Sequence, residues 1–106
     1  MRFVNLTHHP IRVVTKSGEM RELPPSGQIA RCQYTPVETD VIDDIPIYRI
    51  NYGEVIGLPE PDGESLFIVS AIVKNAVGDA REDVVSVYSV QRQENGSYCK
   101  GFRLNG

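Results

Sequence analysis

Residues 66–90 constrain the fold of this 106-residue chain more than any other segment. They begin with Leu-Phe-Ile-Val at residues 66–69, a continuous apolar run that indicates a strand buried on both faces. Ser70 stands where a helix N-cap is expected, and the apolar residues between it and Gly78 fall at helical spacing. Residues 84–90 then alternate as a strand. The segment therefore predicts a strand, a two-turn helix and a second strand.

Most of the remaining chain alternates between apolar and polar residues, which is the pattern of half-buried strands. Residues 3–6 and 11–15 are expected to form a hairpin with a short loop. Residues 29–34 and 45–52 predict two further strands, the second interrupted by a glycine. Residues 36–44 are acidic and weakly periodic, so they are expected to form an exposed connection or an edge strand.

The end of the chain predicts one more hairpin. Asn95-Gly96 is the dipeptide favoured by type I′ turns, and alternating residues flank it. Within the predicted helix, Lys74 is expected to face outward. We therefore predict one domain, residues 1–106, of the α+β class. It would be mostly antiparallel β, a small sheet or partly closed barrel with one short helix at about 70–78 and a C-terminal β-hairpin.

The charge pattern limits the partners. The net charge is −3 and the eleven Lys and Arg residues are scattered, so the field that holds polymeric nucleic acid is missing. A small phosphorylated ligand is not excluded, because a few arginines and backbone amides can hold it. The N-terminus lacks the apolar run of a signal peptide and no stretch could span a bilayer, so we expect a cytoplasmic protein without membrane contact. Cys32 and Cys99 lack CxxC spacing and are expected to be thiols.

Catalytic and metal-binding patterns are weak. Adjacent His8 and His9 point to opposite sides of an extended backbone, so they do not easily bind one metal. The chain has no GxSxG nucleophile motif, and carboxylate pairs such as Asp43-Asp44 fall in polar segments where solvated side chains are expected. We therefore predict a protein without enzymatic activity, cofactor or metal.

Polar residues in strands and loops are better binding candidates. Arg31 and Arg49 are predicted inside strands, where an arginine needs a carboxylate, a phosphate or water, and with Arg81 they could converge on one anion. The alternative is that each pairs with a neighbouring acid. Ser26-Gly27 could form an anion nest or a plain loop. Ser70 could hold an anion or only cap its helix.

Three motifs carry a resemblance to a known family. Asn5-Leu-Thr-His-His-Pro-Ile, Leu23-Pro-Pro-Ser-Gly and Ala30-Arg31 resemble a family of short bacterial and phage-encoded proteins that start with an Asn-Leu-Thr-Pro-His-like motif. The similarity continues through Tyr52-Gly53, Gly57-Leu-Pro and Ile68-Val-Ser, so it covers most of the chain. His8 stands where that pattern usually has proline.

The resemblance implies no established activity. Phage and mobile-element genes of this size often encode counter-defence proteins, including oligomeric sponges that sequester nucleotide immune signals. In a similar protein, the residues that match the family motifs would line a pocket, with arginines on phosphates and a tyrosine stacked on the base. These residues are Asn5, Thr7, His9, Ser26, Gly27, Arg31, Tyr52 and Ser70. With Arg49 and Arg81 they make ten predicted site residues.

Three functional hypotheses follow. The first is a non-enzymatic, homo-oligomeric protein that binds a small nucleotide-like ligand, with Arg31 and Arg49 holding the anion. The second is a protein-interaction module or inhibitor of a host protein, which would dock through an exposed strand edge near the acidic residues 38–44. The third is a small hydrolase that uses His9 with a carboxylate.

Overall fold

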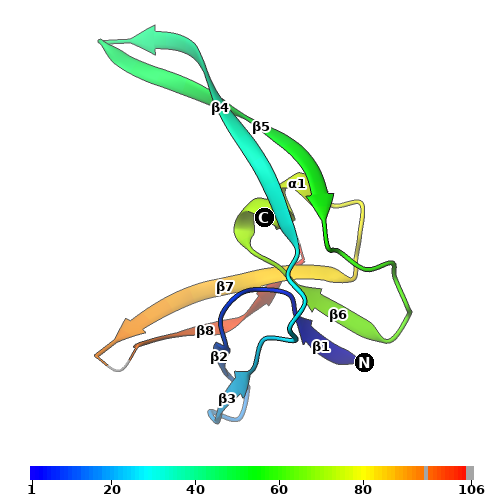
Figure 1. Cartoon of the computed structure of the whole chain (residues 1–106). Helices are drawn as coiled ribbons and strands as arrows, with labels where there is room; N and C mark the ends of the chain where they lie inside the picture. The colour runs from blue at the N-terminus through cyan, green and yellow to red at the C-terminus, as the bar shows by residue number, and fades with distance from the viewer. Residues whose placement is uncertain (95, 105–106) are drawn as a thin grey trace.

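A computed structural model describes residues 1–94 and 96–104. In chain order, the elements are β1 (Arg2–Asn5), β2 (Ile11–Val14), β3 (Met20–Leu23), β4 (Arg31–Ile42), β5 (Ile45–Ile56), β6 (Ser65–Ile68), α1 (Ala71–Val77), β7 (Val84–Gln93) and β8 (Gly96–Arg103) (Figure 1). The predicted fold class is confirmed: the chain is mostly strands, with a nearly closed sheet, one short helix and a C-terminal hairpin. No helix in the described residues is long and apolar enough to cross a membrane.

The predicted strand–helix–strand unit is confirmed as β6, α1 and β7, in which the two strands pair in parallel. Ser70 caps the helix, because its hydroxyl oxygen accepts a 3.3 Å hydrogen bond from the Val73 amide. At the other end Gly78, with φ of 68°, donates its amide to the Lys74 carbonyl at 2.8 Å. The outward position predicted for Lys74 is wrong: the residue is buried, and its Nζ donates to the Gly78 carbonyl at 3.1 Å. It thereby satisfies a carbonyl at the helix end.

Six strands form one sheet in the order β1-β6-β7-β8-β2-β3. The predicted hairpin between residues 3–6 and 11–15 is wrong, because β1 pairs with β6 in parallel while β2 lies between β8 and β3. Both segments are strands, but alternation within a strand does not say which strand is its neighbour. The sheet curls so that its edge strands meet: the side-chain amide of Asn5 in β1 donates to the Leu23 carbonyl of β3 at 3.0 Å.

The main core lies on one face of this sheet. Phe67, Val69 and Val84 pack there with Val73 of α1, and Leu6 and Ala30 complete the buried cluster. The first residues of β4 and the last of β5 contribute half-buried side chains to the same cluster. The helix and the base of the β4–β5 hairpin thus cover this face of the sheet.

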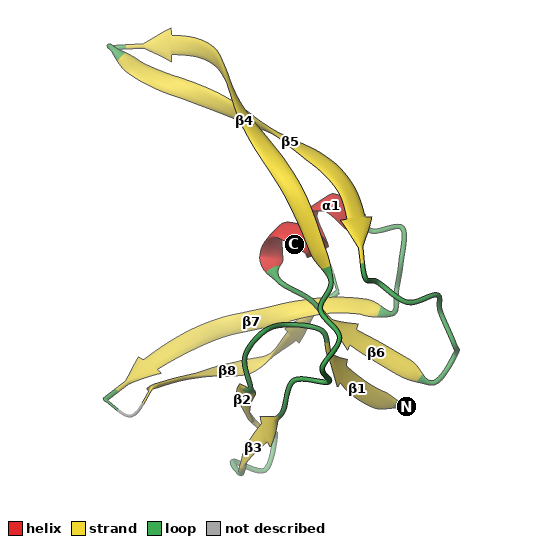
Figure 2. Cartoon of the chain, in the orientation of Figure 1, coloured by secondary structure: helices red, strands yellow, loops and turns green. Residues whose placement is uncertain are grey.

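Among the described residues, strands β4 and β5 pair only with each other, in a twelve-residue antiparallel ribbon that extends away from the sheet (Figure 2). The predicted strand at 45–52 is confirmed, but it passes through Gly53 and ends at Ile56. A Cβ at Gly53 would lie 3.2 Å from the Gln33 carbonyl oxygen, so the glycine permits close pairing here. Of the two alternatives for residues 36–44, the strand is the one observed: they complete β4 and enter the turn at the tip.

The C-terminal hairpin is formed by β7 and β8, which pair antiparallel from Ser86 opposite Arg103 to Gln93 opposite Gly96. Asn95 of the predicted type I′ turn lies outside the described residues. The hairpin itself is as predicted.

Candidate functional site

The curled sheet holds a cavity of about 740 Å³. Every strand of the sheet contributes to its lining: Phe3 of β1, Leu66 of β6, Val85 of β7, Phe102 of β8, Val13 of β2 and Arg21 of β3. Small-molecule sites in proteins are typically about 300–1,000 Å³ and mostly apolar. The cavity has the size and the surface of such a site.

Strand alternation explains why these side chains meet. Phe67 belongs to the main core, so its neighbour Leu66 points to the other face of the sheet. The same reasoning places Val85, next to the core residue Val84, on that other face. Phe3 is the register partner of Leu66 and shares its face. The cavity is therefore the side of the sheet that faces away from α1.

Phe3 and Phe102 form an aromatic wall. Their ring centroids lie 5.1 Å apart, with 40° between the ring planes. They come from opposite ends of the chain. In the sheet, β6 and β7 lie between β1 and β8, and the curl of the sheet brings the two rings together. Phe3 is still 45% exposed, so much of its ring is available for contact with another molecule.

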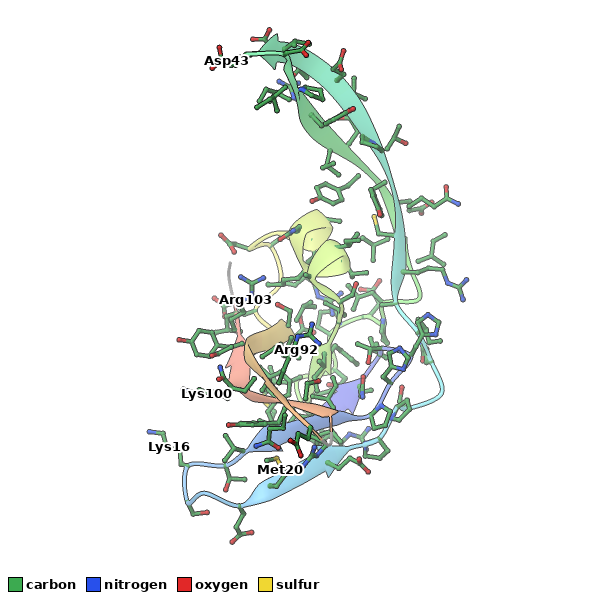
Figure 3. All side chains as sticks on the ribbon, turned by 90° about the vertical axis from the view of Figure 1, so that its left-hand side faces the viewer. Lys16, Met20, Asp43, Arg92, Lys100 and Arg103 are labelled. Atoms are coloured by element: carbon green, nitrogen blue, oxygen red, sulfur yellow. The ribbon has the colours of Figure 1, made fainter. Side chains whose placement is uncertain are left out.

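Charged side chains stand on two sides of the cavity. Lys16 and Arg21 come from the β2–β3 hairpin, and both are exposed. Glu82 and Asp83 come from the segment just before β7. Lys16 also borders a second hollow of about 380 Å³, which Lys100 helps to line. Figure 3 shows Lys16 and Lys100 on the same side of the molecule. Cations therefore gather on the β2–β3 side.

Asp83 is engaged by Arg81, one of the predicted site residues. The arginine donates to the carboxylate from Nε at 2.8 Å and from Nη2 at 2.7 Å, and Nη2 also donates to the Pro59 carbonyl at 2.9 Å. These side-chain hydrogen bonds are the main cause that lowers the pKa of Asp83, and they raise the pKa of Arg81. Arg81 therefore pairs with a neighbouring acid, and Glu82 is the exposed carboxylate on this side of the cavity.

Asn5, Thr7 and His9 form a hydrogen-bond network that shapes the loop after β1. Asn5 is buried, and its side-chain amide donates to the carbonyls of His9 and Leu23, at 2.9 and 3.0 Å. Its Oδ1 accepts from the amide and the hydroxyl of Thr7, at 2.9 and 2.6 Å. The His9 side chain is exposed, with its ring centroid 6.3 Å from that of His8. The polar groups of Asn5 are thus all used inside the protein.

Ser26 and Gly27 lie in the loop between β3 and β4. The Ser26 amide donates to the Asn5 carbonyl at 2.9 Å, and the Ser26 hydroxyl exchanges hydrogen bonds with the backbone of Gln28. Gly27 has φ of 96°, which a turn requires and a side chain disfavours. Ser70 caps α1 as described above. The geometry of these residues is that of a loop and a helix cap.

The structure separates Arg31 from Arg49. Arg31 begins β4 opposite Ile56, whereas Arg49 lies opposite Val37, seven residues away along β5. At about 3.3 Å per residue, the two arginines are roughly 23 Å apart along the ribbon. They do not converge within one chain. Tyr52 lies between them on β5, opposite Tyr34.

No protein-family model, curated protein or solved structure matches the chain.

None of the ten predicted site residues is among the described residues that line the cavity. Sequence reasoning missed Phe3, Phe102, Lys16 and Arg21, because each lies in a predicted strand or turn where an apolar or solvated role is ordinary. No local signal distinguishes them. Within residues 1–94 and 96–104, no three His, Cys, Asp or Glu side chains lie close enough to hold a metal ion.

Proposed function

We propose that this chain is a non-enzymatic binding protein that holds a small anionic ligand with a planar ring, of the nucleotide class, in the cavity of the curled sheet. The observation that carries the proposal is that an aromatic wall and two cations, Lys16 and Arg21, border one cavity of about 740 Å³. The nucleotide hypothesis is kept, but its site moves from the ten predicted residues to this cavity.

The apolar lining supports the ring part of the ligand. Phe3 and Phe102 offer ring faces and edges, and Leu66 and Val85 offer flat aliphatic surface beside them. A base that stacks on an aromatic side chain gains about 1–3 kcal/mol. The cavity therefore favours a planar heterocycle over a flexible polar molecule.

The cations support the anionic part. Arg21 can bind two phosphate oxygens with its planar guanidinium, and Lys16 and Lys100 can add point charges. Glu82 comes from the segment before β7, which β8 separates from β2 and β3 in the sheet, and it would repel a phosphate and accept from an exocyclic amino group. The phosphate is therefore expected toward β2 and β3, and the base toward β7.

Thermal-shift measurements and calorimetry with linear mononucleotides and cyclic dinucleotides test the proposal, beside adenosine and inorganic phosphate as partial ligands. A nucleotide at 100 times its Kd stabilises the folded protein by about 2.7 kcal/mol. We expect the partial ligands to shift the Tm less, and chromatography to recover the nucleotide unchanged, as a sponge requires. No shift across the panel would reject the proposal, and conversion of the nucleotide would reject its non-enzymatic part.

Two variants and one control locate the site. Arg21→Gln removes a charge-assisted contact and Phe102→Leu removes a ring while keeping an apolar side chain, so each should weaken binding by about 10-fold. Arg92→Gln is the control, because Arg92 is an exposed cation on β7 that does not line the cavity. If Arg92→Gln weakens binding as much as Arg21→Gln does, the ligand lies elsewhere.

A second candidate is a protein-interaction module. The acidic segment that suggested it, residues 38–44, lies on the projecting β4–β5 hairpin, whose side chains are almost all exposed. The hairpin also exposes apolar and aromatic side chains, among them Tyr48 and Ile50. Exposed apolar surface often marks a contact with another protein.

A further inference from the structure

Beyond its base, the β4–β5 hairpin exposes many apolar and aromatic side chains to solvent. Each strand has twelve residues, about 40 Å at 3.3 Å per residue, and the ribbon pairs with no other strand in the part of the chain that the structure describes. A single two-stranded hairpin is marginally stable in water, and it needs a covering surface to become rigid.

The register divides the ribbon into two faces, because residues directly opposite each other point the same way. One face, here called the tyrosine face, consists of four pairs: Tyr34 with Tyr52, Pro36 with Ile50, Glu38 with Tyr48, and Val41 with Pro46. Seven of its eight side chains are apolar or aromatic. The opposite face interrupts its apolar residues with Thr35, Asp40, Arg49 and Asn51. The tyrosine face is thus the continuous apolar surface.

This face is open to solvent. Tyr48 is 55% exposed, Tyr34 50%, and Tyr52 and Ile50 39% each. If a fully exposed Tyr or Ile offers about 200 Å², the eight residues expose roughly 500 Å² per chain. That equals the largest apolar patch of a typical monomer, and two such faces together bury about 1,000 Å², where specific interfaces begin.

We propose that the occupant is a second copy of this chain, with the two tyrosine faces packed against each other in antiparallel directions around a two-fold axis. An apolar face of uniform character is complementary to itself, which is the requirement of a two-fold contact. The charges along the hairpin then determine the relative direction and the register of the two copies.

Direction follows from the acidic tip. Asp40, Asp43 and Asp44 lie within five residues at the free end of the hairpin. A parallel arrangement would place the two tips side by side, and their carboxylates would repel. The antiparallel arrangement separates the tips by roughly 40 Å, well beyond the Debye length of about 8 Å.

Register follows from Glu38, the single charge on the tyrosine face. With the two-fold axis at the Pro36–Ile50 pair, Glu38 of one copy lies over Tyr34 and Tyr52 of the other, whose hydroxyls can donate to the carboxylate. The same register brings the tip of each copy level with Arg31 at the base of the other. Arg31 is exposed and has no ion pair among the described residues, and it lies on the opposite face of β4 from Tyr34, so it adds positive charge near the partner's acidic tip without facing it directly.

Sedimentation or light scattering at increasing protein concentration tests the assembly. The chain has a mass of 11.8 kDa, and we expect twice this mass at high concentration. A mass that stays at one chain up to about 200 μM, or an assembly larger than two, would overturn the proposal.

Ile50 gives the sharpest variants, because a residue at the two-fold axis meets itself. Ile50→Asp places two carboxylates together and should weaken association at least 100-fold. Ile47→Asp is the matched control: Ile47 is also an exposed isoleucine of β5, but it lies on the opposite face beside Asp40, so its substitution should change association less than about 3-fold. Equal loss in both variants would show that the tyrosine face is not the contact.

A mixture of two variants tests the symmetry and guards against misfolding. Ile50→Asp and Ile50→Lys should each be monomeric, and a 1:1 mixture should associate again, because a carboxylate then meets an ammonium at the axis. Native mass spectrometry distinguishes the mixed dimer by its mass. Two variants that each keep the folded circular dichroism spectrum and remain monomeric when mixed would reject the two-fold contact at Ile50.

Discussion

The side-chain amide of Asn5 donates a 3.0 Å hydrogen bond to the backbone carbonyl of Leu23, and this bond ties β1 to β3 across the seam of the curled sheet. The same amide group also donates to the His9 carbonyl, and the side-chain Oδ1 of Asn5 accepts from the amide and the hydroxyl of Thr7. One side chain thus fixes the loop after β1 and the closure of the sheet.

Replacing Asn5 by alanine is therefore expected to destabilise the protein by about 2–4 kcal/mol, because it leaves two carbonyls and two donors without their partner near the core. Asn5→Asp should be at least as harmful, since it replaces two donors with acceptors that face carbonyl oxygens. Urea unfolding measures both. Asn75→Ala, at an exposed helix position, is the control and should change stability by less than about 0.5 kcal/mol.

Gly57 is expected to tolerate no side chain. Its φ is +87°, and a Cβ would lie 2.3 Å from the Ile29 carbonyl oxygen, so the backbone must move. We expect Gly57→Ala to lower the free energy of unfolding by about 3–5 kcal/mol. Gly18→Ala distinguishes backbone strain from a steric clash, because Gly18 has φ of +92° but open space around it. This variant should lower the free energy of unfolding by only about 1 kcal/mol. Similar losses at both positions would contradict the role of the Ile29 contact.

The Arg81–Asp83 pair predicts a loss of stability in acid. Hydrogen bonds from Arg81 lower the pKa of Asp83 from its ordinary value of 3.8. The stability that the ionised Asp83 contributes is therefore present above about pH 4, and it is lost as the pH falls through the lowered pKa of Asp83 in the folded state. Asp83→Asn should lower the free energy of unfolding by about 1–2 kcal/mol at pH 7. The free energy of unfolding of this variant should also fall less steeply in acid. Urea unfolding between pH 2 and 7 checks it, with the exposed Asp79→Asn as control.

The two cysteines should react at very different rates. Burial raises the pKa of the Cys99 thiol, and the residue is only 2% exposed, so little reactive thiolate is available. Cys32 is half-buried at the base of the hairpin. We expect iodoacetamide to label Cys32 first in the native protein and both cysteines together in urea, as mass spectrometry of the peptides will report. Native labelling of Cys99 at the rate of Cys32 would contradict the burial argument.

The sequence was sufficient for β6, α1 and β7 because every determinant lies within that segment: the apolar run, the Ser70 cap and the Gly78 stop. It was not sufficient for the neighbours of β1. Phe3 alternates as a strand residue in either case, and nothing nearby shows that its partner is Leu66 rather than a residue of β2.

The site shows the same limit. Phe3 and Phe102 meet only after four strands have taken their order in the curled sheet, so no spacing within the sequence predicts the aromatic wall. Lys74 is a further case: helical periodicity places it on a polar side, whereas the carbonyl of Gly78 draws its ammonium to a buried helix end. Strand pairing between distant residues and individual hydrogen bonds determine which side chains meet and which are buried, and the local sequence pattern does not predict either.

The parallel pairing of β1 with β6 also sets an order of events during synthesis. The register partner of Asn5 is Ile68, which is synthesised 63 residues later and therefore about 3–13 s later at 5–20 residues per second. In that interval the β4–β5 hairpin can close on itself, since its partners are adjacent in sequence. β1 therefore stays without its β6 partner until after the β4–β5 hairpin has been synthesised.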